Sequence, residues 1–205
     1  MITIWALFCA LLAPGDSRPP DLVELRNEKR IEGYVLYEDR ERLVVRVGSR
    51  EQELAMAEVA TVRSVARTLK EVFARDDQLD PQKPGGRLAL AHLCQSQGLP
   101  GEAEVLALSV LVSEPANQEA HELCGHVHRK NGWFVKRGTK TLPFDELAKP
   151  SKDFGSAWKL RTSHYLVTTN LGLEDAVGAV LDLERFYQAF FGLFATELSL
   201  YEVVE

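Results

Sequence analysis

Apolar and polar residues alternate between residues 21 and 65, which is the period of a half-buried β-strand. Five short strands with polar turns between them are expected, at residues 22–26, 31–36, 43–47, 51–55 and 59–65. An open sheet of such short strands would leave unpaired edges, so the pattern predicts a small closed or half-open β-barrel over residues 21–65. Gly33 lies within a strand and is expected to mark a sharp bend.

Helical periodicity replaces the alternation after the barrel. One helix is expected at about 66–78. A helix-turn-helix follows, and the start of a second one lies 34 positions later, where Ala91 is matched by Gly125 and Gly98 by Gly132. This spacing is typical of tetratricopeptide repeats, which bind partners more often than they catalyse reactions.

The second repeat is cut short. Trp133 and Phe134 stand where its second long helix would begin, and we expect them to close the shortened unit or, alternatively, to form a platform on which a ligand stacks. About three repeats are needed for a continuous core. The repeat helices must therefore pack against the helix at 66–78 and against the Trp133 segment, and together these make a helical tetratricopeptide-like unit at 66–135.

A polar stretch at 136–157 is expected to be a linker, and a last module follows at 158–205. A strand is expected at 165–169, then a helix at about 174–196 with a wide apolar stripe, and the start of another strand at 197–204. The aromatic members of the stripe are Phe186, Tyr187, Phe190, Phe191 and Phe194. One strand and one helix cannot bury five aromatic rings, so we expect an incomplete α/β domain, and a docking surface wherever the stripe is uncovered.

The first residues form an apolar run at 2–13 that is too short to span a bilayer as a helix. It suits the core of a signal peptide, although no Lys or Arg precedes it and no Ala-x-Ala site follows. We expect residues 1–17 to be a signal peptide, with an uncleaved anchor or a buried strand as alternatives. The protein would then be secreted, periplasmic or part of the cell envelope, without a membrane span after cleavage.

Composition and charge narrow the kinds of partner. The 205 residues are 45% hydrophobic and carry a formal net charge of −6, as expected for an ordinary globular protein. A nucleic-acid-binding protein usually carries a dominant basic surface, whereas here the charges are mostly mixed. We therefore expect a protein partner and no nucleic acid.

Residues 121–128 contain a cluster of metal-ligating residue types. His121, Cys124 and His128 could share one helix face, but His121 and His126 are five positions apart, about 140° around a helix, unlike the histidines of H-E-x-x-H. Ordinary side chains are the expectation, with no metal, cofactor or catalytic residue. Cys94 and Cys124 are expected on neighbouring helices as buried thiols or, after export, as a disulfide.

The order of these modules resembles that of exported multidomain proteins of planctomycete-type bacteria. Residues 21–35 resemble their Sm-like small barrels, and residues 88–99 with 120–133 resemble their truncated tetratricopeptide unit. The stretch at 163–170 with the aromatic helix is similar to the opening of a peptidase-MA-like domain of unknown function, related to zinc-dependent gluzincin peptidases. In that family the zinc ligands lie in an H-E-x-x-H helix downstream of this opening, and no residue of this sequence matches them.

Together these patterns predict an α+β protein: a small N-terminal β-barrel, central tetratricopeptide-like α-hairpins and a C-terminal strand-helix fragment of an α/β domain. We expect an exported, non-catalytic protein that acts in protein interaction or scaffolding. Candidate interaction residues are Trp133, Phe134, Phe186, Phe190 and Phe194. The alternatives are the front end of a gluzincin-like zinc metallopeptidase with its active site outside this chain, and RNA binding through the Sm-like barrel.

Overall fold

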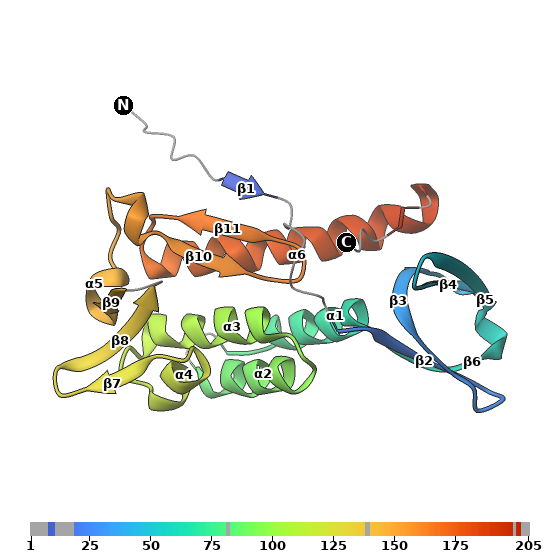
Figure 1. The fold of residues 1–205 in the computed structure, drawn as a ribbon, viewed down its shortest axis with the longest axis horizontal. Coiled ribbons are helices and arrows are strands. Elements are labelled where there is room, and N and C mark those ends of the chain that lie inside the picture. Colours follow the sequence, from blue (N-terminus) through green and yellow to red (C-terminus); the bar gives the residue numbers. More distant parts are fainter. Residues whose placement is uncertain (1–7, 11–18, 81–82, 138–139, 199, 202–205) are drawn as a thin grey trace. The chain divides into compact units, whose positions relative to one another are not determined.

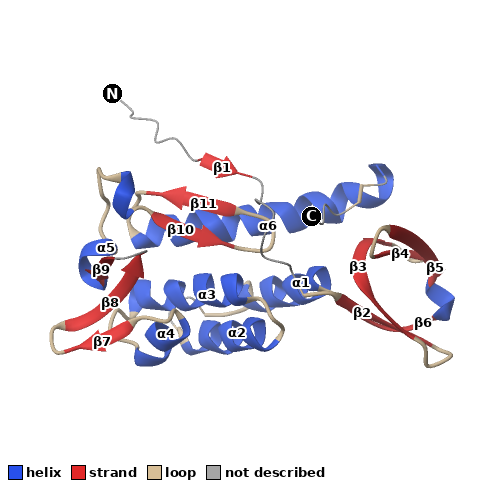
Figure 2. Cartoon of the chain, in the orientation of Figure 1, coloured by secondary structure: helices blue, strands red, loops and turns tan. Residues whose placement is uncertain are grey.

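Helices and antiparallel sheets are combined in the computed structural model, which describes residues 8–10, 19–80, 83–137, 140–198 and 200–201 (Figures 1 and 2). The predicted α+β class is confirmed. The chain forms two units: residues 1–13 with 74–185, and residues 14–73 with 186–205. None of the described helices is long and apolar enough to cross a membrane.

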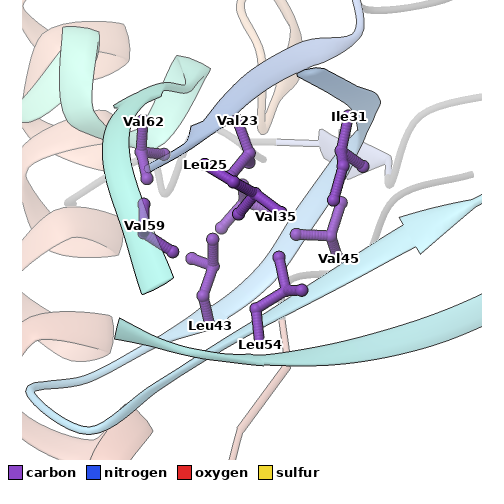
Figure 3. Close-up of a cluster of buried hydrophobic side chains, with 9 residues drawn as sticks. All are labelled: Val23, Leu25, Ile31, Val35, Leu43, Val45, Leu54, Val59 and Val62. Atoms are coloured by element: carbon purple, nitrogen blue, oxygen red, sulfur yellow. The ribbon is translucent and has the colours of Figure 1, made fainter. Parts of the chain in front are cut away.

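The second unit contains a five-stranded antiparallel sheet. Its strands, in the order in which they pair, are β5 (Arg50–Ala55), β4 (Arg42–Val47), β3 (Arg30–Glu38), β2 (Asp21–Leu25) and β6 (Val59–Arg63). A 3-10 turn, η1 (Met56–Glu58), joins β5 to β6. Alternate side chains point to one face and form a buried core, drawn in Figure 3: Val23, Leu25, Ile31, Val35, Leu43, Val45, Leu54, Val59 and Val62.

Asp21 joins this sheet to the helix that follows it. Its buried carboxylate accepts hydrogen bonds from the backbone N–H of Val35 (2.8 Å) and from that of Val65 (2.9 Å), the first residue of α1 (Val65–Asp76). Gly33 lies where β3 meets β4, since a Cβ there would come within 2.5 Å of the Arg46 carbonyl oxygen. Gly33 therefore lets β3 and β4 approach closely. The irregularity in the pairing of β3 lies further along the strand, between Val35 and Tyr37, and not at Gly33, where a bend is predicted.

The first unit contains the helices of the predicted repeat. They are α2 (Gly85–Ser96), α3 (Pro100–Ser113) and α4 (Gln118–Leu123). Helix α3 is buried on nearly all sides, which explains its almost uniformly apolar sequence. Gly98, with φ of 73°, turns the chain between α2 and α3. The Asn117 side chain accepts the Ala120 N–H and so caps the start of α4.

A three-stranded meander follows α4, with strands β7 (Val127–Arg129), β8 (Gly132–Arg137) and β9 (Lys140–Pro143), and it leads into α5 (Phe144–Leu147). Part of the segment expected to be a linker is thus folded, since Phe144 and Leu147 are buried. The local sequence does not predict β9 and α5, because Lys140, Pro143 and Lys149 interrupt any regular apolar period.

The last elements form a second three-stranded sheet with a long helix. The 3-10 turn η2 (Phe154–Ser156) precedes β10 (Trp158–Arg161) and β11 (Leu166–Thr169), and β1 (Phe8–Ala10) pairs with β11 on its other side. Apart from residues 8–10, the predicted signal peptide lies outside the described residues. Helix α6 (Leu173–Leu198) extends two residues beyond its expected end, where a strand had been predicted to start.

Gly101 fixes the distance between α3 and β10. A Cβ at this position would lie 2.2 Å from the backbone carbonyl oxygen of Arg161, so no side-chain movement can relieve the clash. We expect Gly101→Ala to lower the free energy of unfolding by about 2 kcal/mol. Gly178→Ala is the matched control, because its Cβ meets nothing within 4 Å and alanine favours a helix. Urea unfolding of both variants tests this, and equal stability of Gly101→Ala and the wild type would contradict the packing described.

Candidate interaction surface

The C-terminal half of α6, residues 186–198, carries large apolar side chains that are open to solvent. Their exposed fractions are 64% for Phe186, 38% for Phe190, 67% for Leu193, 40% for Phe194 and 60% for Leu198. At 100° per residue, these five positions fall within an arc of about 140° on one side of the helix. We call these five residues the apolar face of α6. No charged residue occurs between Phe186 and Ala195.

A neighbouring side of the same half-helix borders a groove of about 1010 Å³ within the second unit. Tyr187 and Phe191, whose rings stack with centroids 4.4 Å apart, line it from α6. Leu36 and Tyr37 of β3 line it from the sheet. Because Leu36, Tyr37 and Val44 form a second small core on the face of the sheet opposite to that of Figure 3, this sheet is apolar on both faces.

Charged groups form the other part of the groove wall, and Glu38, Asp39 and Arg67 among them have charged or hydrogen-bonding partners. Glu38 forms an ion pair with Arg67 of α1, which raises the pKa of the Arg67 guanidinium. The Asp39 carboxylate accepts the backbone N–H groups of Arg42 and Glu41 and the Tyr37 hydroxyl, and these bonds lower its pKa. The groove therefore lies between an apolar side of α6 and a charged wall on which Glu38 and Arg67 neutralise each other.

Such a surface can bind an apolar or amphipathic partner, since contiguous exposed apolar area of this kind is typical of interaction sites. The structure brings Phe186, Phe190 and Phe194 together on the apolar face of α6. Trp133 and Phe134 lie elsewhere, on β8: Trp133 stacks on His121 with ring centroids 4.3 Å apart, and the Arg129 guanidinium lies 5.1 Å from the Phe134 ring. Trp133 thus packs against the helical unit.

The sequence alone did not indicate the groove, although it held one signal. Residues 34–37 are four consecutive apolar or aromatic residues, Tyr-Val-Leu-Tyr, and this run breaks the alternation of the sheet. A strand with buried side chains on both faces has such a run. The local sequence could not predict which segment lies beside the Leu36 and Tyr37 face of the sheet, because Tyr187 lies 150 positions after Tyr37.

The histidine and cysteine candidates do not gather as a metal site. His121 Nδ1 lies 2.7 Å from His126 Nδ1, so the argument that these histidines point apart is wrong: α4 ends at Leu123, and Gly125, with φ of 65°, turns the chain back. His128 lies beside Trp133. In the described part of the chain, no group of three or more His, Cys, Asp or Glu could hold a metal ion.

Cys94 and Cys124 are both free thiols. The Cys124 thiol lies 3.8 Å from the Glu104 carbonyl oxygen, to which it can donate a weak hydrogen bond. Burial raises the pKa of Cys94 to about 12 and also raises the pKa of Cys124, and nearby carboxylates, Glu102 and Glu104 respectively, add to each shift. Neither thiol is therefore activated as a nucleophile.

Two buried carboxylates connect elements of the first unit. Glu102 of α3 accepts the backbone N–H of Ser163 (2.6 Å), and Glu184 of α6 lies 2.7 Å from His164 Nδ1. Burial raises the pKa of Glu102, and Glu184 adds to the shift, while the bonds from Ser163 oppose it. These groups connect α3, the turn between β10 and β11, and α6.

Comparison with protein-family models, with curated proteins and with solved structures finds no match to this chain. The geometry of the surface is therefore the basis for a functional argument.

Proposed function

We propose that this protein is an exported, non-catalytic interaction module, and that the apolar face of α6 binds an amphipathic helix of a protein partner. The observation that carries the proposal is the exposure of five large apolar side chains on a half-helix that carries no charged residue before Glu197. Leaving such a face in water forgoes the free energy gained when apolar surface is buried. A partner that covers it recovers this free energy.

The dimensions of the face favour a helical partner. Residues 186–198 rise about 20 Å along the axis, which equals three to four turns of a second helix. Ala189 and Gly192 are exposed beside this arc, where they also line the groove, and a Cβ on Gly192 would meet nothing within 4 Å. Small residues beside large ones let the ridge of one helix enter the groove of another.

The charge pattern of the sheet supports a protein partner over RNA. Arg30 lies 3.0 Å from Glu24, Arg42 lies 3.7 Å from both Asp39 and Glu53, and Arg67 pairs with Glu38. Because binding to phosphates depends on unneutralised positive charge, arginines already paired with carboxylates contribute little to it.

The finer architecture belongs to the same proposal. We assign residues 21–65 to a small Sm-like barrel, 66–135 to a tetratricopeptide-like unit and 158–205 to an incomplete peptidase-like module. The helical pair α2 and α3, which pack against each other with α4 beside them, supports the second assignment. The strand β11 followed by the long helix α6 supports the third.

A labelled amphipathic peptide tests the proposal. A helical peptide of about 14 residues, with leucines on one face and uncharged polar residues on the other, is titrated with the protein and followed by fluorescence anisotropy. We expect Leu193→Asp to weaken binding at least about tenfold, because the carboxylate would have to be desolvated in the complex. Leu193 is mostly exposed, so the fold should tolerate the change.

The matched control is Val127→Asp, which likewise replaces an exposed apolar residue, here of β7, by aspartate. It should bind the peptide like the wild type. Equal binding by Leu193→Asp and the wild type, or no binding at all, would refute the proposal. Sedimentation velocity of the protein alone tests whether the face binds a second copy of this chain. If the wild type is a dimer and Leu193→Asp is a monomer, a second copy, and no other protein, covers the face.

A further inference from the structure

Two buried histidines share a hydrogen bond where the helical unit meets the β7–β8 hairpin. His121 Nδ1 lies 2.7 Å from His126 Nδ1, and His121 Nε2 lies 2.8 Å from the carbonyl oxygen of Pro115. His121 is 0% exposed and His126 is 8% exposed. Water therefore has little access to either ring.

The bonds fix the protons of the pair. A carbonyl oxygen only accepts, so His121 Nε2 carries a proton and, in the neutral ring, Nδ1 is left as an acceptor. His126 Nδ1 must then be the donor. A proton added to His121 Nδ1 would set two N–H groups against each other, and a proton added to His126 Nε2 would place a cation in a buried site.

Several elements meet at this pair. The Trp133 ring of β8 stacks on His121, and the Phe144 ring of α5 meets His121 edge-on with centroids 4.8 Å apart. The charged and titratable groups that act on the pair are Asp145 of α5, His128 of β7 and Arg137 of β8. Asp145 favours a proton on His121, whereas His128 opposes it, and Arg137 opposes a proton on His126.

We propose that the His121–His126 pair is an acid-sensitive latch, which holds the β7–β8 hairpin on the helical unit while both rings are neutral and releases it when either ring gains a proton. Release would part the Trp133 ring from His121 and expose the end of α4. This device is independent of the apolar face of α6.

The direction of the pH dependence follows from the two states. Burial lowers the pKa of His126 to about 4, with His121 and Arg137 adding to the shift, and burial also lowers the pKa of His121. A released histidine has a pKa of about 6.5. The latch is therefore fully stabilising above pH 6.5, and its contribution is lost as the pH falls from about 6.5 towards 4.

Hydrogen exchange of the backbone amides tests the latch. Exchange in β7 and β8 is measured by mass spectrometry at pH 7.5 and pH 5.0 and corrected for the intrinsic rate at each pH. We expect the opening equilibrium of the hairpin to rise roughly 30-fold at pH 5.0, as one histidine with these two pKa values requires. Amides of β10 and β11 serve as the internal reference and should change much less.

Two variants distinguish the latch from a general effect of acid. His126→Asn keeps a donor near His121 Nδ1 but removes the titration of residue 126, so the roughly 30-fold rise in hairpin opening should shrink to the smaller rise that His121 alone produces. His92→Asn removes an exposed histidine that pairs with Glu119, and it should keep the pH dependence of the wild type.

If His126→Asn does not fold, the wild-type protein still tests the latch. The ring protons of its histidines can be titrated by NMR. The latch requires His126 to titrate well below pH 6.5 while the hairpin opens over the same pH range. A His126 ring that titrates near 6.5 with the hairpin still protected would overturn the proposal. So would hairpin exchange that is equal at the two pH values.

Discussion

Asp76→Ala is expected to lower the free energy of unfolding by about 3 to 5 kcal/mol, the largest effect that we predict for a single substitution. The Asp76 carboxylate is fully buried and pairs with Arg87, 2.9 Å away, and with Arg185. It thus connects α1, α2 and α6 within the first unit. Removing it leaves two partly buried guanidinium groups without their shared counter-charge.

Asp77 is the matched control for this change. It is the next residue, it lies 3.3 Å from the same Arg185, and its side chain is 62% exposed. Asp77→Ala should cost at most about 0.5 kcal/mol, because exposed ion pairs contribute little. Urea unfolding followed by the fluorescence of Trp133 and Trp158, both in the first unit, measures the two variants. Similar costs for Asp76→Ala and Asp77→Ala would show that Asp76 does not hold the helices together.

Asp21→Ala is expected to destabilise the second unit by about 2 to 4 kcal/mol. The substitution leaves the backbone N–H groups of Val35 and Val65 buried without their carboxylate acceptor, and each such loss costs about 1 to 3 kcal/mol. Asp21→Asn keeps one acceptor oxygen and should cost roughly half as much. Hydrogen exchange of these two amides reports the loss directly, and unchanged protection in Asp21→Ala would be incompatible with the bonding described.

Local patterns predicted the regular elements of the chain well. The alternation between residues 21 and 65 placed all five strands of the five-stranded sheet, because its larger core lies on one face and strand side chains alternate between faces. The apolar stripe predicted α6 to within two residues at its C-terminal end. Both signals are periodic, and periodicity is a property of the local sequence.

The remaining elements depend on contacts that the local sequence does not contain. Strand β9 and helix α5 have no apolar period, and they fold because Phe144 and Leu147 are buried against the rest of the unit. The contact between His121 and His126 could not be predicted without knowing that α4 ends at Leu123 and that Gly125 turns the chain back, since a continuous helix would have separated the rings. The groove joins Tyr37 to Tyr187, and only the tertiary fold brings them together.

The candidate interaction residues also show what the local sequence can and cannot predict. Phe186, Phe190 and Phe194 were identifiable as one face of a helix, but their exposure depends on what packs around α6. Trp133 gave an equally strong aromatic signal, yet its ring is occupied by the stack on His121. Sequence patterns thus identified the apolar side chains, and only the packing distinguished surface from interior.

The most direct test of the central claim, that the apolar face of α6 binds a helical protein partner, is isothermal titration calorimetry with the amphipathic peptide at several temperatures. Burial of apolar surface predicts a negative heat capacity change on binding to the wild type and its loss in Leu193→Asp. Binding with a heat capacity change near zero, or binding that Leu193→Asp leaves intact, would contradict the claim.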